Sequence, residues 1–194
     1  TGNPVRDRVR SAVQIAYPAL TPEGEVSVLV FGGSQGARAF SDIVPPAIAA
    51  LDEGLRRRLR LTQQCRPEDL DRVTQAYRAA RVNVELAAFF DDLPERIAAS
   101  HLVIGRAGAS TVAELAAIGR PAILVPLPGS LDQDQRANAT VMANAGGGWL
   151  APDALIVVEQ AKEEALELPT GFALLEDRRY GAARFLFLRQ AKTK

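Results

Sequence analysis

The sequence contains a single cysteine, Cys65, among its 194 residues. One thiol cannot form an internal disulfide, which excludes the disulfide-stabilised scaffolds of secreted proteins. No run of the sequence approaches the roughly 20 consecutive apolar residues that a membrane-spanning helix needs. We therefore expect a soluble protein that works in the reducing environment of the cytoplasm.

The chain also has no formal net charge, because 23 lysines and arginines balance 23 aspartates and glutamates. A neutral chain has no overall field that attracts nucleic acid or an anionic membrane, so we expect no nucleic-acid partner, and any anion must be bound locally. The basic run Arg56-Arg57-Arg58 is interpreted as a solvated helix end. Cys65 and His101 are distant in sequence and form no nucleophile-and-base pattern. No metal-ligand cluster is apparent, and we expect neither a metal nor a cofactor.

The first residue is Thr1, and the residues after it do not show the basic region and apolar segment of a signal peptide. This start is compatible with removal of an initiator methionine. It also fits a sequence that begins inside a longer protein, and we expect the second case.

Short apolar runs alternate with segments of helical spacing. We expect strands over residues 26–31, 59–64, 82–86, 101–105 and 121–125, and helices over residues 36–51, 67–80, 92–100, 110–118 and 132–145. Pro45 and Pro46 are expected to break or kink the first of these helices. The alternation predicts an α/β fold, a Rossmann-like open parallel sheet with helices on both faces.

Residues 1–150 are predicted to form this domain. Residues 151–194 change in character and are expected to form an atypical tail, partly helical over 153–168, that packs on the same domain.

The loop Gly32-Gly33-Ser34-Gln35-Gly36 follows the first expected strand. Its glycines let backbone amides approach an anion at a helix N-terminus, and a pyrophosphate would fit there. The loop matches neither the dinucleotide fingerprint GxGxxG nor the Gly-Lys-Ser/Thr phosphate loop. On the residues alone, an anion site and a simple tight turn both remain open.

The loop from Gly105 to Glu114 also leads directly from a strand into a helix. Ser110 or Thr111 can cap that helix, and Glu114 is expected in its first turn. One interpretation is that Glu114 only completes a helix cap. The other is that its carboxylate accepts hydrogen bonds from the vicinal hydroxyls of a ribose.

Two further loops carry candidate residues. Asp132, Gln135 and Asn138 are spaced three apart near a helix start, where they could either contact sugar hydroxyls or form an exposed polar face. Phe89 and Phe90 follow the third strand, where they could pack against a base or belong to the core.

Together these loops, with the opening Thr1-Gly2-Asn3-Pro4-Val5-Arg6, resemble the MurG family in order and spacing over about residues 1–150. Members are two-domain GT-B inverting glycosyltransferases that transfer N-acetylglucosamine (GlcNAc) from UDP-GlcNAc to lipid I, giving lipid II in peptidoglycan synthesis. The chain is similar to the C-terminal, donor-binding domain.

The resemblance implies roles for individual residues. Arg6 and Ser34 would contact the donor phosphates or sugar, and the backbone of Gly33, Gln35 and Gly36 would lie nearby. The Phe90 backbone would bind uracil, and Glu114 would hold the ribose. Ser110 and Thr111 would flank the phosphates, and Gln135 would contact the GlcNAc hydroxyls. Asp134 stands where the family often has glutamine and Ala107 where it has serine, so contacts at these two positions are in doubt.

The resemblance also implies what the chain lacks. The general base and the acceptor surface would belong to a missing N-terminal domain, through which the enzyme would reach its lipid-linked acceptor at the inner face of the bacterial membrane. The isolated chain is expected to bind donor weakly and to transfer nothing.

Three alternatives remain. The chain could be the donor domain of another GT-B enzyme that prefers UDP-glucose or UDP-galactose. It could instead be a nucleotide-sugar-binding or epimerase-like module, or a non-functional fragment.

Overall fold

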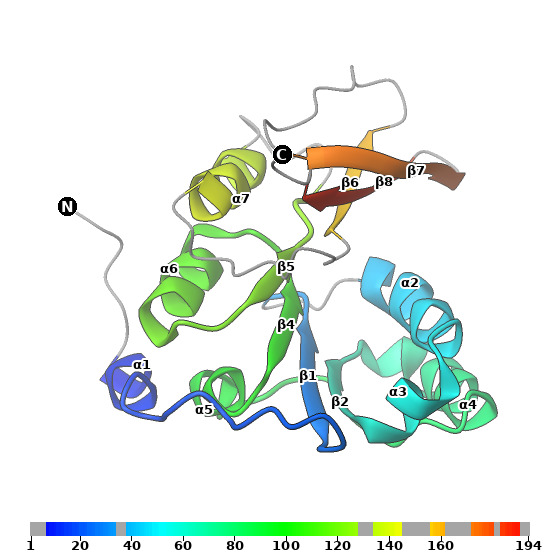
Figure 1. Ribbon diagram of the computed structural model, residues 1–194, viewed down its shortest axis with the longest axis horizontal. Coiled ribbons are helices and arrows are strands. Elements are labelled where there is room, and N and C mark those ends of the chain that lie inside the picture. The colour runs from blue at the N-terminus through cyan, green and yellow to red at the C-terminus, as the bar shows by residue number, and fades with distance from the viewer. Residues whose placement is uncertain are drawn as a thin grey trace.

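The computed structural model describes residues 7–33, 38–127, 134–144, 156–161, 172–180 and 183–190. Its centre is a five-stranded sheet in which every neighbouring pair of strands is parallel (Figure 1). The strands are β1 (Val26–Phe31), β2 (Leu59–Gln64), β3 (Val84–Ala87), β4 (Leu102–Gly105) and β5 (Ala122–Leu124).

The strand order is β3-β2-β1-β4-β5, with β1 at the centre. The chain builds outward from β1 in one direction to β3 and then returns to add β4 and β5 on the other side. This order reverses between β1 and β4, and ligands of open parallel sheets bind at such a reversal, outside the carboxyl ends of the strands. The predicted Rossmann-like fold is thus confirmed.

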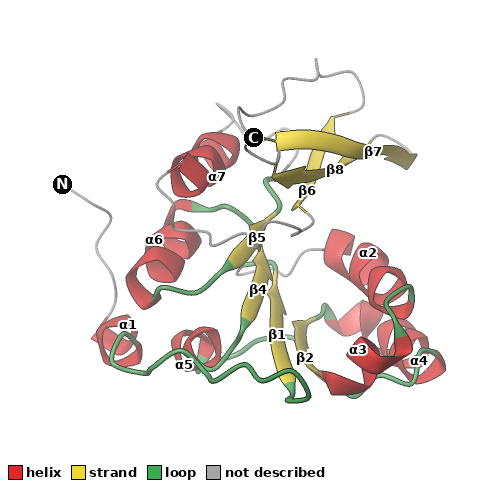
Figure 2. Ribbon diagram, viewed as in Figure 1, coloured by secondary structure: helices red, strands yellow, loops and turns green. Residues whose placement is uncertain are grey.

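Helices cover both faces of the sheet (Figure 2). The described helices are α1 (Asp7–Ala12), α2 (Arg38–Ala49), α3 (Glu53–Arg58), the 3-10 turn η1 (Pro67–Asp69), α4 (Leu70–Ala79), α5 (Leu93–Ala98), α6 (Ala109–Ile118) and α7 (Asp134–Asn144), the last of which packs on α6. The sequence analysis did not predict α1 or the full extent of α3.

Two cores follow from the alternation of side chains along β1. Val28 and Val30 belong to the cluster that α2 and α4 cover, whereas Leu29 and Phe31 belong to the cluster that α1, α5 and α6 cover. Successive side chains of a strand point to opposite faces, so a continuous apolar run is needed when both faces are buried. The sequence of β1 meets that need.

Helix α2 continues through Pro45 and Pro46, so the predicted break is wrong, while the predicted alternative of a kink stays a prediction. A proline has no backbone N–H, so it cannot donate the helical hydrogen bond to the carbonyl four residues earlier. For Pro45 that carbonyl belongs to Ser41, and it accepts a hydrogen bond from Arg72 Nη1 of α4 at 3.4 Å instead. A neighbouring helix thus supplies the donor that the sequence of α2 lacks.

The expected helix over 153–168 is also corrected. Residues Ile156–Ala161 form strand β6, which pairs antiparallel with β8 (Ala183–Gln190), and β8 pairs antiparallel with β7 (Phe172–Tyr180). The β-branched run Ile156-Val157-Val158 favours a strand over a helix. Among the described helices, none has the length and apolar character to cross a bilayer.

Arg120 joins three elements on the face that carries α5 and α6. Its side chain is buried at 3% exposure and donates to backbone carbonyls of Ala98 (2.9 Å), Ile118 (2.9 Å) and Ile15 (2.8 Å). Ala98 and Ile118 are the last residues of α5 and α6, where a cation complements the helix dipole. The guanidinium therefore holds the segment after α1 against the ends of two helices.

Replacing Arg120 with methionine is expected to lower the free energy of unfolding by about 3 kcal/mol, because it leaves several buried carbonyls without their charged donor. Urea denaturation measures this change. The matched control is Arg60→Ala, since Arg60 pairs with Glu25 where both side chains are 67% exposed, and this change should leave the free energy of unfolding nearly unaltered. Similar losses in the two variants would contradict the clamp role of Arg120.

Candidate functional site

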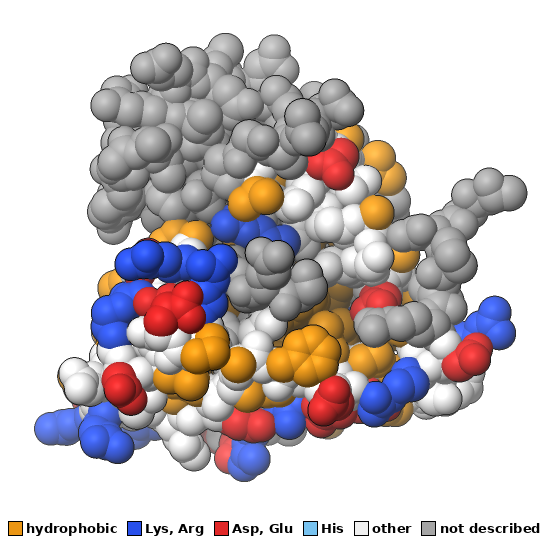
Figure 3. Space-filling model, turned by 180° about the vertical axis from the view of Figure 1, so that it is seen from behind, with side chains coloured by type: hydrophobic (Ala, Val, Ile, Leu, Met, Phe, Trp, Pro, Cys, Tyr) orange, Lys and Arg blue, Asp and Glu red, His pale blue; other side chains and the backbone are white. Residues whose placement is uncertain are grey.

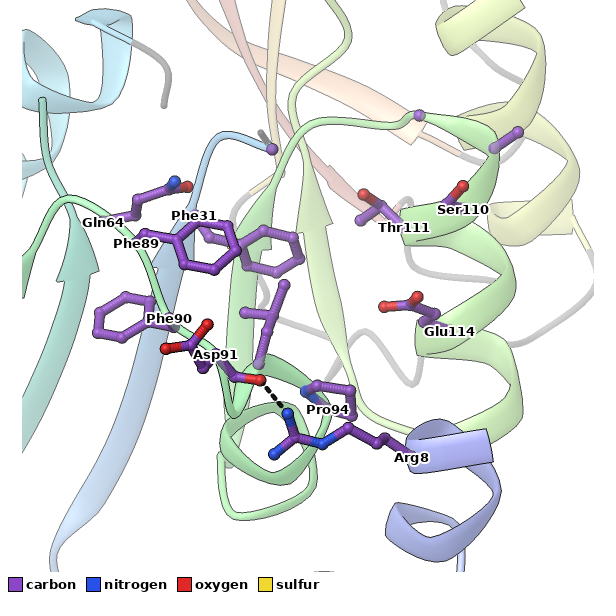
Figure 4. A pocket seen from close by; sticks show the side chains of 14 residues that line it. Arg8, Phe31, Gln64, Phe89, Phe90, Asp91, Pro94, Ser110, Thr111 and Glu114 are labelled. Carbon is purple, nitrogen blue, oxygen red and sulfur yellow. Dashed lines mark hydrogen bonds between the residues drawn. The ribbon is translucent and has the colours of Figure 1, made fainter. Parts of the chain in front are cut away.

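A cavity of about 750 Å³ opens at the carboxyl edge of the parallel sheet. This volume is within the range of small-molecule sites. Figure 4 shows the side chains around it, and Figure 3 shows apolar side chains gathered between charged ones on one face of the molecule. The lining residues are Arg8, Phe31, Gly33, Gln64, Phe89, Phe90, Asp91, Leu93, Pro94, Gly108, Ala109, Ser110, Thr111 and Glu114.

Loops that follow three different strands meet at this cavity. Gly33 comes after β1, Phe89 and Phe90 after β3, and Gly108 after β4. Gly33 has a φ of 86°, and within the described part of the chain no heavy atom lies within 4 Å of the position that a Cβ would occupy. This backbone conformation favours glycine, and Gly33 lines the cavity.

Gln64 ties two of these loops together. It is buried, its Oε1 accepts from the Gly32 N–H at 3.0 Å, and its Nε2 donates to the Ala88 carbonyl at 3.1 Å. The side chain thereby links the end of β1 to the end of β3. The sequence analysis missed this residue, although its place at the end of a parallel strand was a usable signal.

Helix α6 presents a polar face to the cavity. Its N-cap is Gly108, and no side chain forms a capping hydrogen bond there. The expected capping by Ser110 or Thr111 is therefore wrong. Ser110 and Thr111 instead lie within the first turn and line the cavity. They stand beside the helix end at which backbone N–H groups and the dipole favour an anion.

Glu114 follows one turn later on the same face of α6. It is 6% exposed and lines the cavity, toward which it points in Figure 4. Its position six residues after the N-cap Gly108 places it outside the first turn and rules out a capping box, in which the acid is three residues from the cap. The simpler interpretation of Glu114 as a helix cap is therefore wrong.

The two phenylalanines after β3 differ in burial. Phe90 is 7% exposed and belongs to the core, whereas the Phe89 side chain is 62% exposed and lines the cavity. The Arg96 guanidinium lies 4.5 Å from the centre of the Phe90 ring, a cation–π contact. The Phe90 ring is fixed in this way, whereas the exposed Phe89 ring offers an aromatic face to the cavity.

Arg96 is itself held by two carboxylates. Its Nε donates to Asp92 Oδ1 at 2.7 Å and its Nη1 to Glu85 Oε2 at 2.8 Å. The hydrogen bond from Arg96 holds the pKa of Asp92 below its ordinary value. These contacts anchor the loop after β3 to the sheet and to α5.

Arg8 is a lining residue that the sequence analysis did not identify. It lies on α1, where its Nη1 donates to the Asp91 carbonyl and its Nε donates to Glu95 Oε1 at 3.2 Å. Among the described lining residues it is the one cation. Arg8 and Arg10 lie on the same helix, and no sequence pattern distinguishes Arg8 as the one of these two that lines the cavity.

The structure brings together Gly33, Phe90, Ser110, Thr111 and Glu114 from the predicted set. The other predicted residues Arg6, Ser34, Gln35 and Gly36 lie outside the described residues.

Gln135 lies on α7 and does not line the described cavity. Its Oε1 accepts from the Leu127 N–H at 3.0 Å, while Asn138 Nδ2 donates to the Ala107 carbonyl at 3.1 Å. These two side chains fasten α7 to the loops after β5 and β4. Asp134 Oδ1 accepts from the Gln135 backbone N–H at 2.8 Å.

Cys65 and His101 are both buried in structural contacts. Burial raises the pKa of the Cys65 thiol, which lies 3.5 Å from Ser41 Oγ. His101 Nδ1 accepts from the Ser27 N–H at 2.9 Å. Within the described part of the chain, no group of three or more His, Cys, Asp and Glu residues could hold a metal ion.

Comparison with known proteins adds a family to this geometry. Residues 27–170 match the Glycosyltransferase family 28 C-terminal domain. A protein of Methylobacterium sp. strain 4-46 is 56% identical over 161 residues, which cover 82% of this chain and 43% of the relative. A Rhodopseudomonas palustris protein is 61% identical over 147 residues, covering 76% of this chain and 40% of the relative. Both are named UDP-N-acetylglucosamine--N-acetylmuramyl-(pentapeptide) pyrophosphoryl-undecaprenol N-acetylglucosamine transferase.

The crystal structure of Acinetobacter baumannii MurG is similar with a TM-score of 0.59 and 32% sequence identity, covering 66% of this chain and 38% of that protein. The chain thus spans less than half the length of these relatives. The family match extends over most of the described parallel sheet, including the loops after β1, β3 and β4. The chain therefore belongs to the glycosyltransferase family 28 C-terminal domain family.

Proposed function

We propose that the chain is the donor-binding half of an inverting glycosyltransferase that transfers GlcNAc from UDP-GlcNAc to lipid I. The observation that carries this proposal is the cavity in which Ser110, Thr111 and Glu114 of α6 face the aromatic loop after β3. The names of the relatives support UDP-GlcNAc as donor and an undecaprenol-linked acceptor.

In this proposal the nucleotide lies along α6. The diphosphate sits at the N-terminus of the helix, where its charge is favoured by free backbone N–H groups and by the hydroxyls of Ser110 and Thr111. Glu114 accepts hydrogen bonds from the ribose hydroxyls. The base then reaches the loop after β3, where the Phe90 backbone meets its polar edge and Phe89 stacks on its face.

The sugar and the outer phosphate would extend toward the loop after β1. The Gly33 backbone is available there, and Arg6, Ser34, Gln35 and Gly36 are proposed to complete the contacts to phosphate and GlcNAc. Gln135 accepts from Leu127 through Oε1, so its Nε2 group is the end that we assign to a GlcNAc hydroxyl.

The chemistry divides between this chain and a second domain. Inverting transfer needs a base that deprotonates the acceptor hydroxyl, and it needs stabilisation of negative charge on the departing UDP. The α6 N-terminus and its hydroxyls supply the second requirement. The base and the acceptor surface are assigned to an N-terminal domain, which would act on the lipid-linked acceptor at the inner face of the membrane, so the isolated chain should bind donor and transfer nothing.

Glu114→Ala is expected to weaken binding of UDP roughly tenfold to a hundredfold, because charge-assisted hydrogen bonds to the ribose hydroxyls are lost. The same reasoning predicts that the wild-type chain prefers UDP to 2′-deoxy-UDP and that the variant does not. Calorimetric titration of both nucleotides into both proteins measures the two preferences.

Glu53→Ala is the matched control for this experiment. Glu53 is an exposed glutamate that pairs with Arg57 on α3, away from the cavity lining, and its removal should leave both affinities unchanged. If Glu114→Ala retained the wild-type preference for the ribonucleotide, the ribose role would be ruled out.

Phe89 and Phe90 allow a paired test of base stacking. Phe89→Ala should reduce UDP affinity by about 1–3 kcal/mol, the usual contribution of an aromatic side chain to base stacking, while the melting temperature stays unchanged because the ring is exposed. Phe90→Ala should instead lower the free energy of unfolding by about 3 kcal/mol, since the smaller side chain leaves a cavity in the core. Thermal unfolding and calorimetric titration separate these effects, and a Phe89→Ala variant that binds UDP like the wild type would contradict the stacking role.

A further inference from the structure

Arg8 lines the cavity at an end away from the start of α6 (Figure 4). Figure 4 shows Ser110 and Thr111 at one end, Glu114 next along the helix, and Arg8 beyond it beside Asp91 and Pro94. Glu114 follows Ser110 by four residues, which corresponds to about 6 Å along a helix axis. The order of groups along the cavity is therefore hydroxyls, carboxylate and guanidinium.

This order places Arg8 at the base of a bound nucleotide and away from its phosphates. The placement rests on the proposed function, in which the diphosphate occupies the α6 N-terminus and the ribose meets Glu114. Within a pyrimidine nucleotide, the edge that carries position 4 of the ring is the part most distant from the ribose. In this placement Arg8 would meet the part of the ligand that differs between uracil and cytosine.

The Arg8 side chain is held in place on two sides. Its Nε and Nη2 both lie 3.2 Å from Glu95 Oε1, and its Nη1 donates to the Asp91 carbonyl. A guanidinium carries five N–H donors and no acceptor. The two terminal nitrogens thus each keep a second N–H for a ligand, while the contacts to α5 and the loop after β3 reduce the entropy lost when it binds.

We infer that Arg8 is a specificity-determining residue that selects a uracil nucleotide by donating a hydrogen bond to the carbonyl oxygen at position 4 of the base. Uracil presents an acceptor at this position, whereas cytosine presents an amino group, which is a donor. A donor-only side chain repels the cytosine amino group and leaves it without a partner. Selection of this kind is strong because the wrong ligand loses a hydrogen bond and leaves polar groups unpaired.

The test is calorimetric titration of UDP and CDP into the wild-type chain and into Arg8→Ala and Arg8→Lys. The wild type should bind UDP at least roughly tenfold more tightly than CDP, in line with the loss of one charge-assisted hydrogen bond. Arg8→Ala should weaken UDP about tenfold and leave CDP nearly unchanged, so that the ratio approaches one. Arg8→Lys keeps donors and charge, and it should retain a reduced preference for UDP.

Arg10→Ala is the matched control, because Arg10 lies on the same helix, pairs with Asp7 and is not among the lining residues. It should leave the ratio of UDP to CDP affinity unchanged. An unchanged ratio in Arg8→Ala, whether both affinities fall together or neither falls, would overturn the inference while the proposed donor site stands. A wild-type chain that binds neither nucleotide would overturn the proposed function and this inference with it.

Discussion

The parallel direction of all five strands is the constraint on which the site depends. Because each strand runs the same way, the loops that follow β1, β3 and β4 all emerge at one edge of the sheet. Residues as distant in sequence as Gly33 and Glu114 can then line one cavity. An antiparallel sheet of the same strands would send alternate loops to opposite edges and would separate them.

Parallel strands need buried faces, and the chain meets that need with two apolar layers on either side of β1. Polar side chains then fix the loops at the edge. Gln64 links the ends of β1 and β3, while Arg96 holds the ring of Phe90 and the two carboxylates beside it. Gln64 and Arg96 hold the loops and have no proposed contact with the ligand, whereas Phe89 and Glu114 are proposed to meet the ligand. Arg8 has both roles. Mutations at Phe89 can therefore change binding without changing stability.

Strand positions could be predicted because each parallel strand is a short apolar run followed by a turn. The predicted bounds of β1 and β2 match the structure, and the helix of residues 109–118 ends at Gly119, whose φ of 71° needs glycine. The same reasoning predicted that loops after different strands lie at one edge, and the structure brings Gly33, Phe90 and Glu114 to one cavity there, since the edge of a parallel sheet follows from strand direction.

Features that depend on tertiary contacts could not be predicted in this way. The sequence of α2 contains two prolines, and the hydrogen bond from Arg72 of α4 that replaces the one missing at Pro45 depends on tertiary packing. Phe89 and Phe90 are identical residues in an irregular loop without periodicity. The sequence therefore could not predict which of the two is buried and which is exposed. Arg8 reaches the cavity through the packing of α1, a helix of six residues that was not predicted.

The central claim is that a donor nucleotide binds at the carboxyl edge of the parallel sheet, along α6. The most direct measurement is a titration of the isotope-labelled chain with UDP, followed by backbone amide chemical shifts. The account predicts the largest changes at Gly33, Phe90, Ser110, Thr111 and Glu114, with α3 and α4 unaffected. Saturable changes confined to another surface, or none at these five amides, would contradict it.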